Sequence, residues 1–164
     1  MPATARITVD LSAQVLTLWH DQSALRQWPV STAANGPGEI SGSGCTPRGR
    51  HIIRAKIGAG AEIGAVFKAR RIAGDVRCYS PEIGAQYPGR DWILTRILWL
   101  SGIEVGINRL GCVDTMRRYI YIHGTPHLDL LGRPASHGCI RMGNADIVEL
   151  FDLVSTGIEV TLHE

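Results

Sequence analysis

The sequence lacks an excess of charge of either sign. Its 17 lysines and arginines are balanced by 15 aspartates and glutamates, which leaves a formal net charge of +2. The basic residues are also scattered along the chain, whereas a nucleic-acid-binding domain gathers them into a patch or stripe. These features argue against nucleic acid as a partner and leave acidic small molecules as candidate ligands.

Long apolar runs are missing as well. No segment is long and apolar enough for a membrane-spanning helix, which needs roughly 20 such residues, so we expect no membrane span. The first residues, MPATARITVDLSAQVLTLWH, have neither the basic start nor the small-residue cleavage site of a secretory signal peptide. This start favours a cytoplasmic protein. The alternative is a periplasmic protein from which an export signal has been removed.

Cysteines are few and never form a C-x-x-C pair. Cys45, Cys78, Cys112 and Cys139 are too sparse for the disulfide framework of a small secreted domain. We therefore expect free thiols, which suit a reducing compartment. Cys45, Cys78 and Cys112 have no histidine cluster beside them, so we assign these three to packing.

What the sequence does contain is enough apolar material for one hydrophobic core. With 45% hydrophobic residues among 164, the chain fits a single domain over residues 1–164. Alternating or short apolar runs, rich in β-branched and aromatic residues, predict a mainly-β domain with few helices. The predicted strands cover residues 5–11, 14–20, 25–33, 51–57, 65–72, 91–102, 117–124 and 158–162. The first three, separated by short polar turns, have the pattern of a β-meander.

Glycine marks two predicted loops between these strands. Residues 35–50, NGPGEISGSGCTPRGR, combine glycine with proline and have poor strand propensity. The segment GAGAEIG resembles a dinucleotide-binding loop, but Gly58, Gly60 and Gly64 miss the G-x-G-x-x-G spacing and no clear helix follows. We therefore predict a turn there.

One segment near the C-terminal end is strongly helical in pattern. Asn144, after Gly143, is the expected N-cap, and Gly157 is expected to end the segment. Between them the apolar residues follow the i, i+3, i+4, i+7 spacing of a helix that packs against a core. These residues are Ile147, Leu150, Phe151 and Val154.

Two polar clusters interrupt the apolar strands. YIYIHGTPH at 119–127 and ASHGCIRM at 135–142 together hold three histidines and one cysteine. A cysteine becomes a useful nucleophile when a neighbouring base or positive charge favours its thiolate. His123, at the end of a predicted strand, can supply the base. Cys139 precedes the predicted helix, whose unpaired N–H groups can stabilise a thiolate or an oxyanion.

Two other roles for Cys139 stay open on the residues alone. A cysteine in a turn can be a small buried packing residue, or it can join His123, His127 and His137 as a zinc ligand. His137 and Cys139 point to the same side only in an extended chain, and no second compact pair accompanies them, so we expect no metal. For His127, which follows a proline in a loop, we expect an exposed structural role.

The two clusters, in this order and at this spacing, resemble the signature of the L,D-transpeptidases of the YkuD type. The matching segment is IHGTPHLDLLGRPASHGCIRMGNADIVELFDLV, in which a His-Gly-Thr element precedes a Ser-His-Gly-Cys-x-Arg element. VSTAANGPGE and TPRG, further upstream, resemble the loop and strand start that precede the active site in that family, whereas residues 58–95 are the least diagnostic. The resemblance implies a β-sandwich or barrel with a few short helices, one of them following the catalytic cysteine.

The same resemblance implies the roles of the site residues. Cys139 would attack an amide carbonyl and form a thioester, and His123 would be the base that activates it. The carbonyl of Gly124 would orient the imidazole in place of the usual carboxylate. The backbone N–H groups of His137, Gly138 and Cys139 would form the oxyanion hole. The His137 side chain stands two residues from the nucleophile and is the weaker candidate for the base.

Other residues near Cys139 and His123 would support the catalytic site. The resemblance implies that Ser136 supports the loop and that Arg141 fixes the loop or binds a substrate carboxylate, and it implies no cofactor. On charge type alone we also consider three other basic residues as binders of substrate carboxylates. These are Arg96, Arg117 and Arg118.

The substrate that the resemblance implies is the peptide stem of peptidoglycan, as a free tetrapeptide or a muropeptide. Cys139 would be acylated at the bond between the diamino acid and the terminal D-Ala. The absence of an export signal favours water as the acceptor, and so a cytosolic L,D-carboxypeptidase of murein recycling. An L,D-transpeptidase that forms cross-links or exchanges D-amino acids is the alternative, and a non-catalytic module that binds wall peptides is a further one. The resemblance also implies that carbapenems acylate Cys139.

Overall fold

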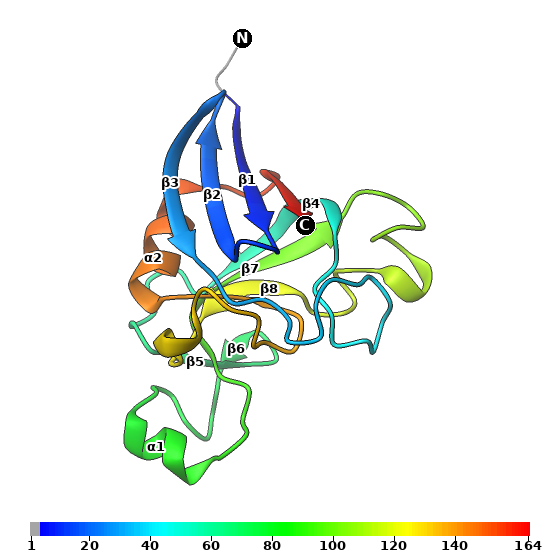
Figure 1. Cartoon of the computed structure of the whole chain (residues 1–164). Helices are drawn as coiled ribbons and strands as arrows, with labels where there is room; N and C mark the ends of the chain where they lie inside the picture. Colours follow the sequence, from blue (N-terminus) through cyan, green and yellow to red (C-terminus); the bar gives the residue numbers. More distant parts are fainter. Residues whose placement is uncertain (1–3) are drawn as a thin grey trace.

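One mixed β-sheet of ten strands dominates the computed structural model, which describes residues 4–164 (Figure 1). Residues 1–3, which the predicted domain includes, lie outside the described residues. The sheet has the order β3-β2-β1-β10-β4-β7-β5-β6, with β8 paired to β7 and β9 paired to β8, so the mainly-β prediction is confirmed. The strands are β1 (Ala5–Asp10), β2 (Val15–His20), β3 (Ser23–Pro29), β4 (Gly49–Ile57), β5 (Val66–Lys68), β6 (Arg71–Ile72), β7 (Ile93–Gly102), β8 (Tyr121–Gly124), β9 (Ile140–Met142) and β10 (Glu159–His163). The helices are α1 (Pro81–Gln86) and α2 (Asn144–Leu153), with short 3-10 turns η1 (Gly111–Val113) and η2 (Leu128–Leu130).

The first three strands form the predicted antiparallel meander, and β1 pairs in parallel with β10. Its inward-facing side chains join the main core with α2, so that Ile7 and Leu16 share one cluster with Ile147 and Leu150. All four are at most 1% exposed. Burying each such side chain stabilises the fold by roughly 1.5–3 kcal/mol. The predicted apolar stripe of α2 is therefore confirmed, and Val154 is buried just beyond the helix.

Strand β7 organises the part of the sheet that carries the polar clusters. It pairs with β4 and then, nearer its start, with β5, while β8 lies antiparallel along it. The β7–β8 register shifts between Leu94 and Ile97, and Thr95 within the shift has a φ of 76°, a strained value for a β-branched residue. Strand β9 then pairs in parallel with β8. This pairing brings the two clusters of the sequence together.

Residues 65–72, predicted as one strand, form the separate strands β5 and β6. Ala69 and Arg70 between them have φ values of 49° and 65°, so a left-handed turn reverses the chain. Residues 58–64 form a turn as predicted. Helix α1 was missed, because it buries no residue and so has no apolar period. Ser80 caps it, accepting a hydrogen bond from the Ile83 N–H at 3.2 Å.

The start of α2 also differs from the prediction. Gly143, and not Asn144, is the N-cap residue. The Asn144 side chain bridges two other elements instead, since it donates to the Thr125 carbonyl at 3.1 Å and accepts from the Thr95 hydroxyl at 2.7 Å. Asn144 therefore ties α2 to β7 and to the end of β8.

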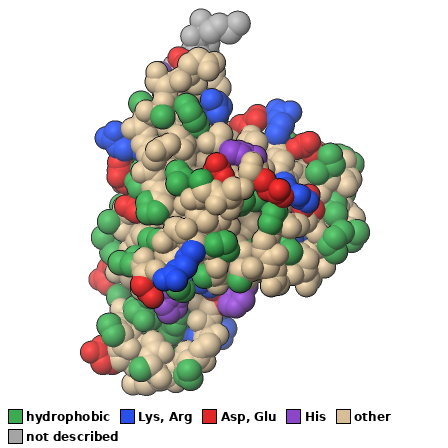
Figure 2. All heavy atoms as spheres, in the orientation of Figure 1, with side chains coloured by type: hydrophobic (Ala, Val, Ile, Leu, Met, Phe, Trp, Pro, Cys, Tyr) green, Lys and Arg blue, Asp and Glu red, His purple; other side chains and the backbone are tan. Residues whose placement is uncertain are grey.

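The surface agrees with the balanced composition, and Figure 2 shows basic and acidic side chains interspersed on the face drawn. Neither helix formed by residues 4–164 has the length and apolar character needed to cross a bilayer. All four cysteines are free. The packing role predicted for Cys78 and Cys112 is wrong, because both are exposed, while Cys45 is half-buried.

His51 on β4 is buried without a charged partner, which makes stability depend on pH. Its ring nitrogens lie 3.0 Å from the Gly49 carbonyl and 2.9 Å from the Thr115 hydroxyl. Burial lowers the pKa of His51 from about 6.5 to about 4. Between about pH 6.5 and pH 4, His51 therefore binds a proton in the unfolded chain but not in the folded chain. We expect His51 to cost about 3 kcal/mol of unfolding free energy between pH 7 and pH 4.

Urea unfolding of the protein at pH 7 and at pH 4 measures this loss. Other groups titrate in the same interval, so the matched control is His51→Gln, which offers an amide to Thr115 and does not titrate. The variant should lose about 3 kcal/mol less than the wild type on acidification. Equal losses in the two proteins would show that His51 does not carry the effect.

Candidate active site around Cys139

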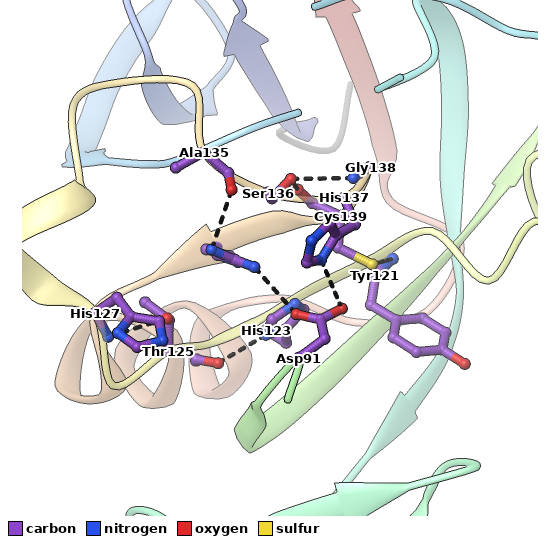
Figure 3. Close-up of polar contacts among 12 residues, drawn as sticks. Asp91, Tyr121, His123, Thr125, His127, Ala135, Ser136, His137, Gly138 and Cys139 are labelled. Atoms are coloured by element: carbon purple, nitrogen blue, oxygen red, sulfur yellow. Dashed lines mark hydrogen bonds and ion pairs between the residues drawn. The ribbon is translucent and has the colours of Figure 1, made fainter. Parts of the chain in front are cut away.

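His123 reaches the site from β8, and Cys139 reaches it from the bend just before β9. In the parallel pairing of β8 with β9, His123 is in register with Arg141, so their side chains lie on one face of the sheet. Cys139 lies in the bend just before β9 and packs against Tyr121. Tyr121 stands two residues before His123 on β8, so the two side chains share a face of the strand. Figure 3 shows the Cys139 sulfur beside Tyr121 and the His123 ring nearby. The structure thus brings together the two residues that the sequence analysis ranked highest.

His123 is completely buried and is held as a neutral ring. Its Nδ1 lies 2.7 Å from the Gly124 carbonyl, and because a carbonyl only accepts, Nδ1 carries the proton. Nε2 has no hydrogen-bond partner among the described residues, so its lone pair is free to accept a proton. Burial lowers the pKa of His123, although the Gly124 carbonyl and the nearby Asp91 charge act against it. The ring therefore stays neutral below the ordinary histidine range.

The space around position 124 admits only a glycine. A Cβ at this position would collide with the Asn144 side-chain oxygen and lie 2.7 Å from the Leu94 carbonyl. Any side chain would thus push the backbone away from β7 and α2. The carbonyl that contacts His123 is fixed in place by this close approach.

The Cys139 thiol is half-buried and is hydrogen-bonded to backbone groups, not to His123. Its sulfur lies 3.3 Å from the Tyr119 carbonyl, to which the thiol donates, and accepts from the Tyr121 N–H at 3.3 Å. Burial raises the pKa of Cys139 to about 12, against the lowering effect of the Tyr121 N–H. Strand β9 separates Cys139 from α2. The expectation that a helix N-terminus directly supports the sulfur is therefore wrong, and the Tyr121 N–H occupies that place.

A neutral resting thiol predicts slow alkylation. The rate at which iodoacetamide modifies Cys139 should rise about tenfold per pH unit from pH 7 to pH 10, because the thiolate is the reactive form and the thiol pKa is about 12. Mass spectrometry of the peptide that contains Cys139 measures the rate, with the peptides of the exposed Cys78 and Cys112 as internal references. A plateau below pH 8 would instead indicate a thiolate already formed in the free protein.

The loop before Cys139 is held by Ser136 and Thr46. The Ser136 hydroxyl donates to the Cys139 carbonyl at 2.6 Å and accepts from the Gly138 N–H at 3.1 Å, and the Thr46 hydroxyl donates to the Gly138 carbonyl at 2.8 Å. Gly138 has a φ of 137°, which a side chain rarely allows. The Gly138 N–H is therefore already hydrogen-bonded to the Ser136 hydroxyl. Within residues 4–164, the N–H groups of His137 and Cys139 have no hydrogen-bond acceptor, so these two remain for an oxyanion.

Asp91 lies between His137 and Arg141, and no sequence motif marks it. Its carboxylate is 3.0 Å from the Arg141 guanidinium. It also lies 3.5 Å from the ring of His137 (Figure 3), and the His137 side chain is exposed. Burial would raise the pKa of Asp91, but the neighbouring basic side chains outweigh this effect and hold the pKa below its ordinary range; among them Arg141 is charged and also donates a hydrogen bond. Arg141 also donates to the Ala135 carbonyl at 3.4 Å. Arg141 therefore ties the loop to Asp91 and is largely buried, although it also lines a surface hollow together with His137.

Cys139 opens into a hollow of about 260 Å³. A second hollow of about 430 Å³ shares Asp91 with it, and a third of about 410 Å³ shares His137. The three adjoining hollows leave room for an extended ligand on both sides of the Asp91–His137 pair. The polar and aromatic residues that line the first hollow with Cys139 are Arg70, Asp91, Arg118, Tyr119, Tyr121 and His137.

Only one of the other basic candidates lies in this hollow. Arg118 lines it, whereas Arg117 lines a separate hollow. Arg96 is buried and donates to two backbone carbonyls. Arg70, which the sequence analysis missed, lines the hollow from the turn between β5 and β6.

The histidines do not converge with Cys139 as a metal centre. Within residues 4–164, no group of three or more histidine, cysteine, aspartate or glutamate side chains could hold a metal ion. His127 is half-buried rather than exposed, and it lines the third hollow, which Cys139 does not line. The structure therefore does not bring His123, His127, His137 and Cys139 together as one ligand set.

A thiol in the bend before β9, a buried neutral imidazole on β8 and free backbone N–H groups beside the sulfur are the parts of a cysteine acyl-transfer site. The family model described as YkuD, L,D-transpeptidase catalytic domain, matches residues 4–162. The chain belongs to this family.

Relatives of known sequence match over a short segment. The YkuD protein of Bacillus subtilis strain 168 is 40% identical over 47 residues, which is 29% of this chain and 29% of that protein. The YkuD protein of Bacillus licheniformis is 39% identical over 46 residues, 28% of each. The chain thus matches under a third of the length of these curated relatives.

Solved structures share the fold over nearly the whole chain. An L,D-transpeptidase from Mycobacterium smegmatis superposes with a TM-score of 0.58 at 21% identity, over 99% of this chain and 59% of that one. L,D-transpeptidase 3 from Mycobacterium tuberculosis gives a TM-score of 0.60 at 17% identity, over 99% and 62%. At these identities the likeness establishes the fold, and the chain spans about three fifths of the length of these structures.

Proposed function

We propose that the protein is a cysteine acyl-transfer enzyme that cleaves peptidoglycan stem tetrapeptides before the terminal D-Ala, with water as the acyl acceptor. This activity is that of an L,D-carboxypeptidase. The observation that carries the proposal is the buried Nε2 of His123, which has no hydrogen-bond partner among residues 4–164 and lies on the strand that the Cys139 thiol contacts at Tyr121. Membership of the L,D-transpeptidase family supports the substrate class.

In the proposed reaction the thiol proton passes to His123 Nε2 as the sulfur leaves the Tyr119 carbonyl. The sulfur attacks the carbonyl carbon of the diamino acid, and the N–H groups of His137 and Cys139 stabilise the resulting oxyanion. The C–N bond then breaks, and His123 returns the proton to the amine of the departing D-Ala. The diamino acid remains bound to Cys139 as a thioester.

Water completes the cycle. His123 removes a proton from the water as its oxygen attacks the thioester carbon, and the C–S bond breaks to release a tripeptide acid. The proton returns to the sulfur. The hollow of about 260 Å³ at Cys139 has the size for the end of one stem peptide, which supports a small acceptor at this position.

Transfer to an amine is the second candidate, and the neighbouring hollows favour it. The hollow of about 410 Å³ on the far side of His137 is lined in part by Tyr79, Tyr87 and Trp92, and it could receive a second stem peptide. An amine from that peptide would replace water and give a cross-link, and a free D-amino acid would give exchange.

Incubation with a free tetrapeptide, followed by mass spectrometry, tests the proposal. Release of D-Ala with formation of the tripeptide supports hydrolysis. Dimers as the sole product would support the transpeptidase, and the absence of both products and of any acyl-enzyme would leave a module that binds wall peptides.

Solved relatives suggest a second probe of the sulfur. One L,D-transpeptidase has been solved in complex with imipenem, and L,D-transpeptidase 3 from Mycobacterium tuberculosis with a faropenem-derived adduct. A reactive β-lactam carbonyl presents the same target as the stem amide. We propose that carbapenems acylate Cys139 in this protein as well.

A further inference from the structure

The hollow at Cys139 contains an arginine that is held in place by aromatic groups. The Arg70 guanidinium lies 5.1 Å from the centre of the Trp99 ring and 4.8 Å from that of Tyr119, and it donates to the Tyr121 hydroxyl at 3.1 Å. Arg70 has a φ of 65° and follows Ala69, whose φ is 49°. Left-handed backbone strains a residue other than glycine. The turn is therefore strained at Ala69 and Arg70, where the chain directs the Arg70 side chain to the hollow.

The positive charge of Arg70 is not matched by a carboxylate. Within residues 4–164, neither Arg70 nor Arg118 has a carboxylate oxygen within salt-bridge distance. Asp91 is the one acidic residue that lines the hollow, and it is already paired with Arg141 and His137. The hollow beside the sulfur therefore carries an excess of positive charge.

The two arginines differ in what they can offer a ligand. Arg118 donates to the Cys45 carbonyl at 2.6 Å and to the carbonyls of Gly38 and Glu39 at 3.2 Å each, with a longer contact of 3.4 Å to the Ser43 hydroxyl. Its donors are largely used, so it contributes a fixed positive charge. Arg70 donates through Nη1 alone, which leaves Nε and Nη2 for a bidentate contact with a carboxylate.

Tyr121 lies between Arg70, with its free Nε and Nη2 donors, and the Cys139 sulfur. Its backbone N–H contacts Cys139 Sγ, and its hydroxyl contacts Arg70. A group bound at Arg70 therefore lies one tyrosine side chain from the nucleophile. This separation suits a carboxylate on one of the two residues that flank the bond to be cleaved.

We propose that Arg70, in the positive field of Arg118, binds a carboxylate of the acyl donor and determines specificity for anionic stem peptides. The proposal rests on the proposed function, because it takes the stem peptide as the donor. Two carboxylates meet the requirement: the side-chain carboxylate of a diaminopimelate-type diamino acid and the terminal carboxylate of the departing D-Ala. A donor whose diamino acid is lysine offers only the second.

Three donor peptides separate these sources. The first is a tetrapeptide with diaminopimelate, the second carries a carboxamide in place of the diaminopimelate side-chain carboxylate, and the third carries a C-terminal amide. Each is assayed for kcat and KM with the wild type and with Arg70→Gln, Arg70→Lys and Arg71→Gln. Arg71 is the matched control, since it is the exposed neighbour on β6 and does not line the hollow.

Arg70→Gln should lower kcat/KM for the free acid by roughly 10- to 100-fold, mainly through KM, as expected for the loss of hydrogen bonds to a charged group. With the peptide in which an amide replaces the recognised carboxylate, kcat/KM of Arg70→Gln should lie within about twofold of the wild-type value. Arg70→Lys should recover part of the loss, and Arg71→Gln should match the wild type. An equal loss with all three peptides, or an equal loss in Arg71→Gln, would overturn the proposal.

Binding separates a failure of the subsite from a failure of the proposed function. Calorimetry with the inactive Cys139→Ala protein should give a Kd that rises roughly 10- to 100-fold when Arg70→Gln is added, for the free acid but not for the matching amide. Turnover by the wild type without this carboxylate dependence would reject the subsite alone. The absence of both binding and turnover with every peptide would reject the proposed function and the subsite together.

Discussion

Cys139→Ala is expected to lower the release of D-Ala from stem tetrapeptides by at least about 1,000-fold, because no other group can form the thioester. The fold should persist, since the thiol makes two hydrogen bonds to backbone groups at 3.3 Å, no charged contact among the described residues, and alanine fits the same space. Imipenem should add its mass to the wild type and not to the variant. Intact-mass measurement and a coupled D-Ala assay report the two effects.

Cys112→Ala is the matched control for this variant. Cys112 is exposed and does not line the hollow, so its loss should change turnover by less than about twofold. Turnover close to that of the wild type in Cys139→Ala, or loss of the imipenem adduct in Cys112→Ala, would show that the nucleophile has been assigned to the wrong residue.

His123→Gln is expected to lower kcat by roughly 100- to 10,000-fold, the range for loss of a general base. Glutamine can bond to the Gly124 carbonyl but cannot take a proton from the thiol. Because burial holds the pKa of His123 below its ordinary range, the wild type should keep its rate as the pH falls through 6.5. Stopped-flow acylation by imipenem and a pH profile of kcat/KM measure the two effects.

His137→Gln distinguishes the two histidines next to the sulfur. His137 is exposed and lies 3.5 Å from Asp91, so its loss should cost no more than about tenfold. The assignment of the base would change if His137→Gln slowed acylation more than His123→Gln. A fall in the wild-type rate centred at pH 6.5 would show that His123 is not shielded from water as the structure indicates.

Local sequence patterns predicted the elements whose apolar spacing follows directly from the geometry of a strand or a helix. Alternation predicted the meander, and the helical stripe predicted which residues of α2 are buried, because both periods follow from backbone geometry. The pairing of His123 with Cys139 followed from two short motifs at a defined spacing. Strands β8 and β9 then bring these motifs into parallel register.

The sequence did not reveal residues whose role depends on distant pairing. Asp91 and Arg70 come from residues 58–95, where no motif stands out. They reach the site because a left-handed turn separates β5 from β6 and because β7 changes partner from β4 to β5. Thr95 at that change has a φ that its residue type does not favour. These contacts depend on tertiary structure, which overrides local preference.

The position of β10 in the sheet has a consequence for biosynthesis. This strand lies between β1 and β4, and it is translated after the other nine strands of the sheet formed by residues 4–164. The meander emerges from the ribosome before the other strands of this sheet, yet its pairing with them through β10 must wait for residues 159–163. A nascent chain therefore exposes the open edges of two incomplete sheets until synthesis has passed this point, and such edges promote association with other chains. Slow release at this stage would increase the need for a chaperone, whereas rapid completion of β10 would close both edges at once.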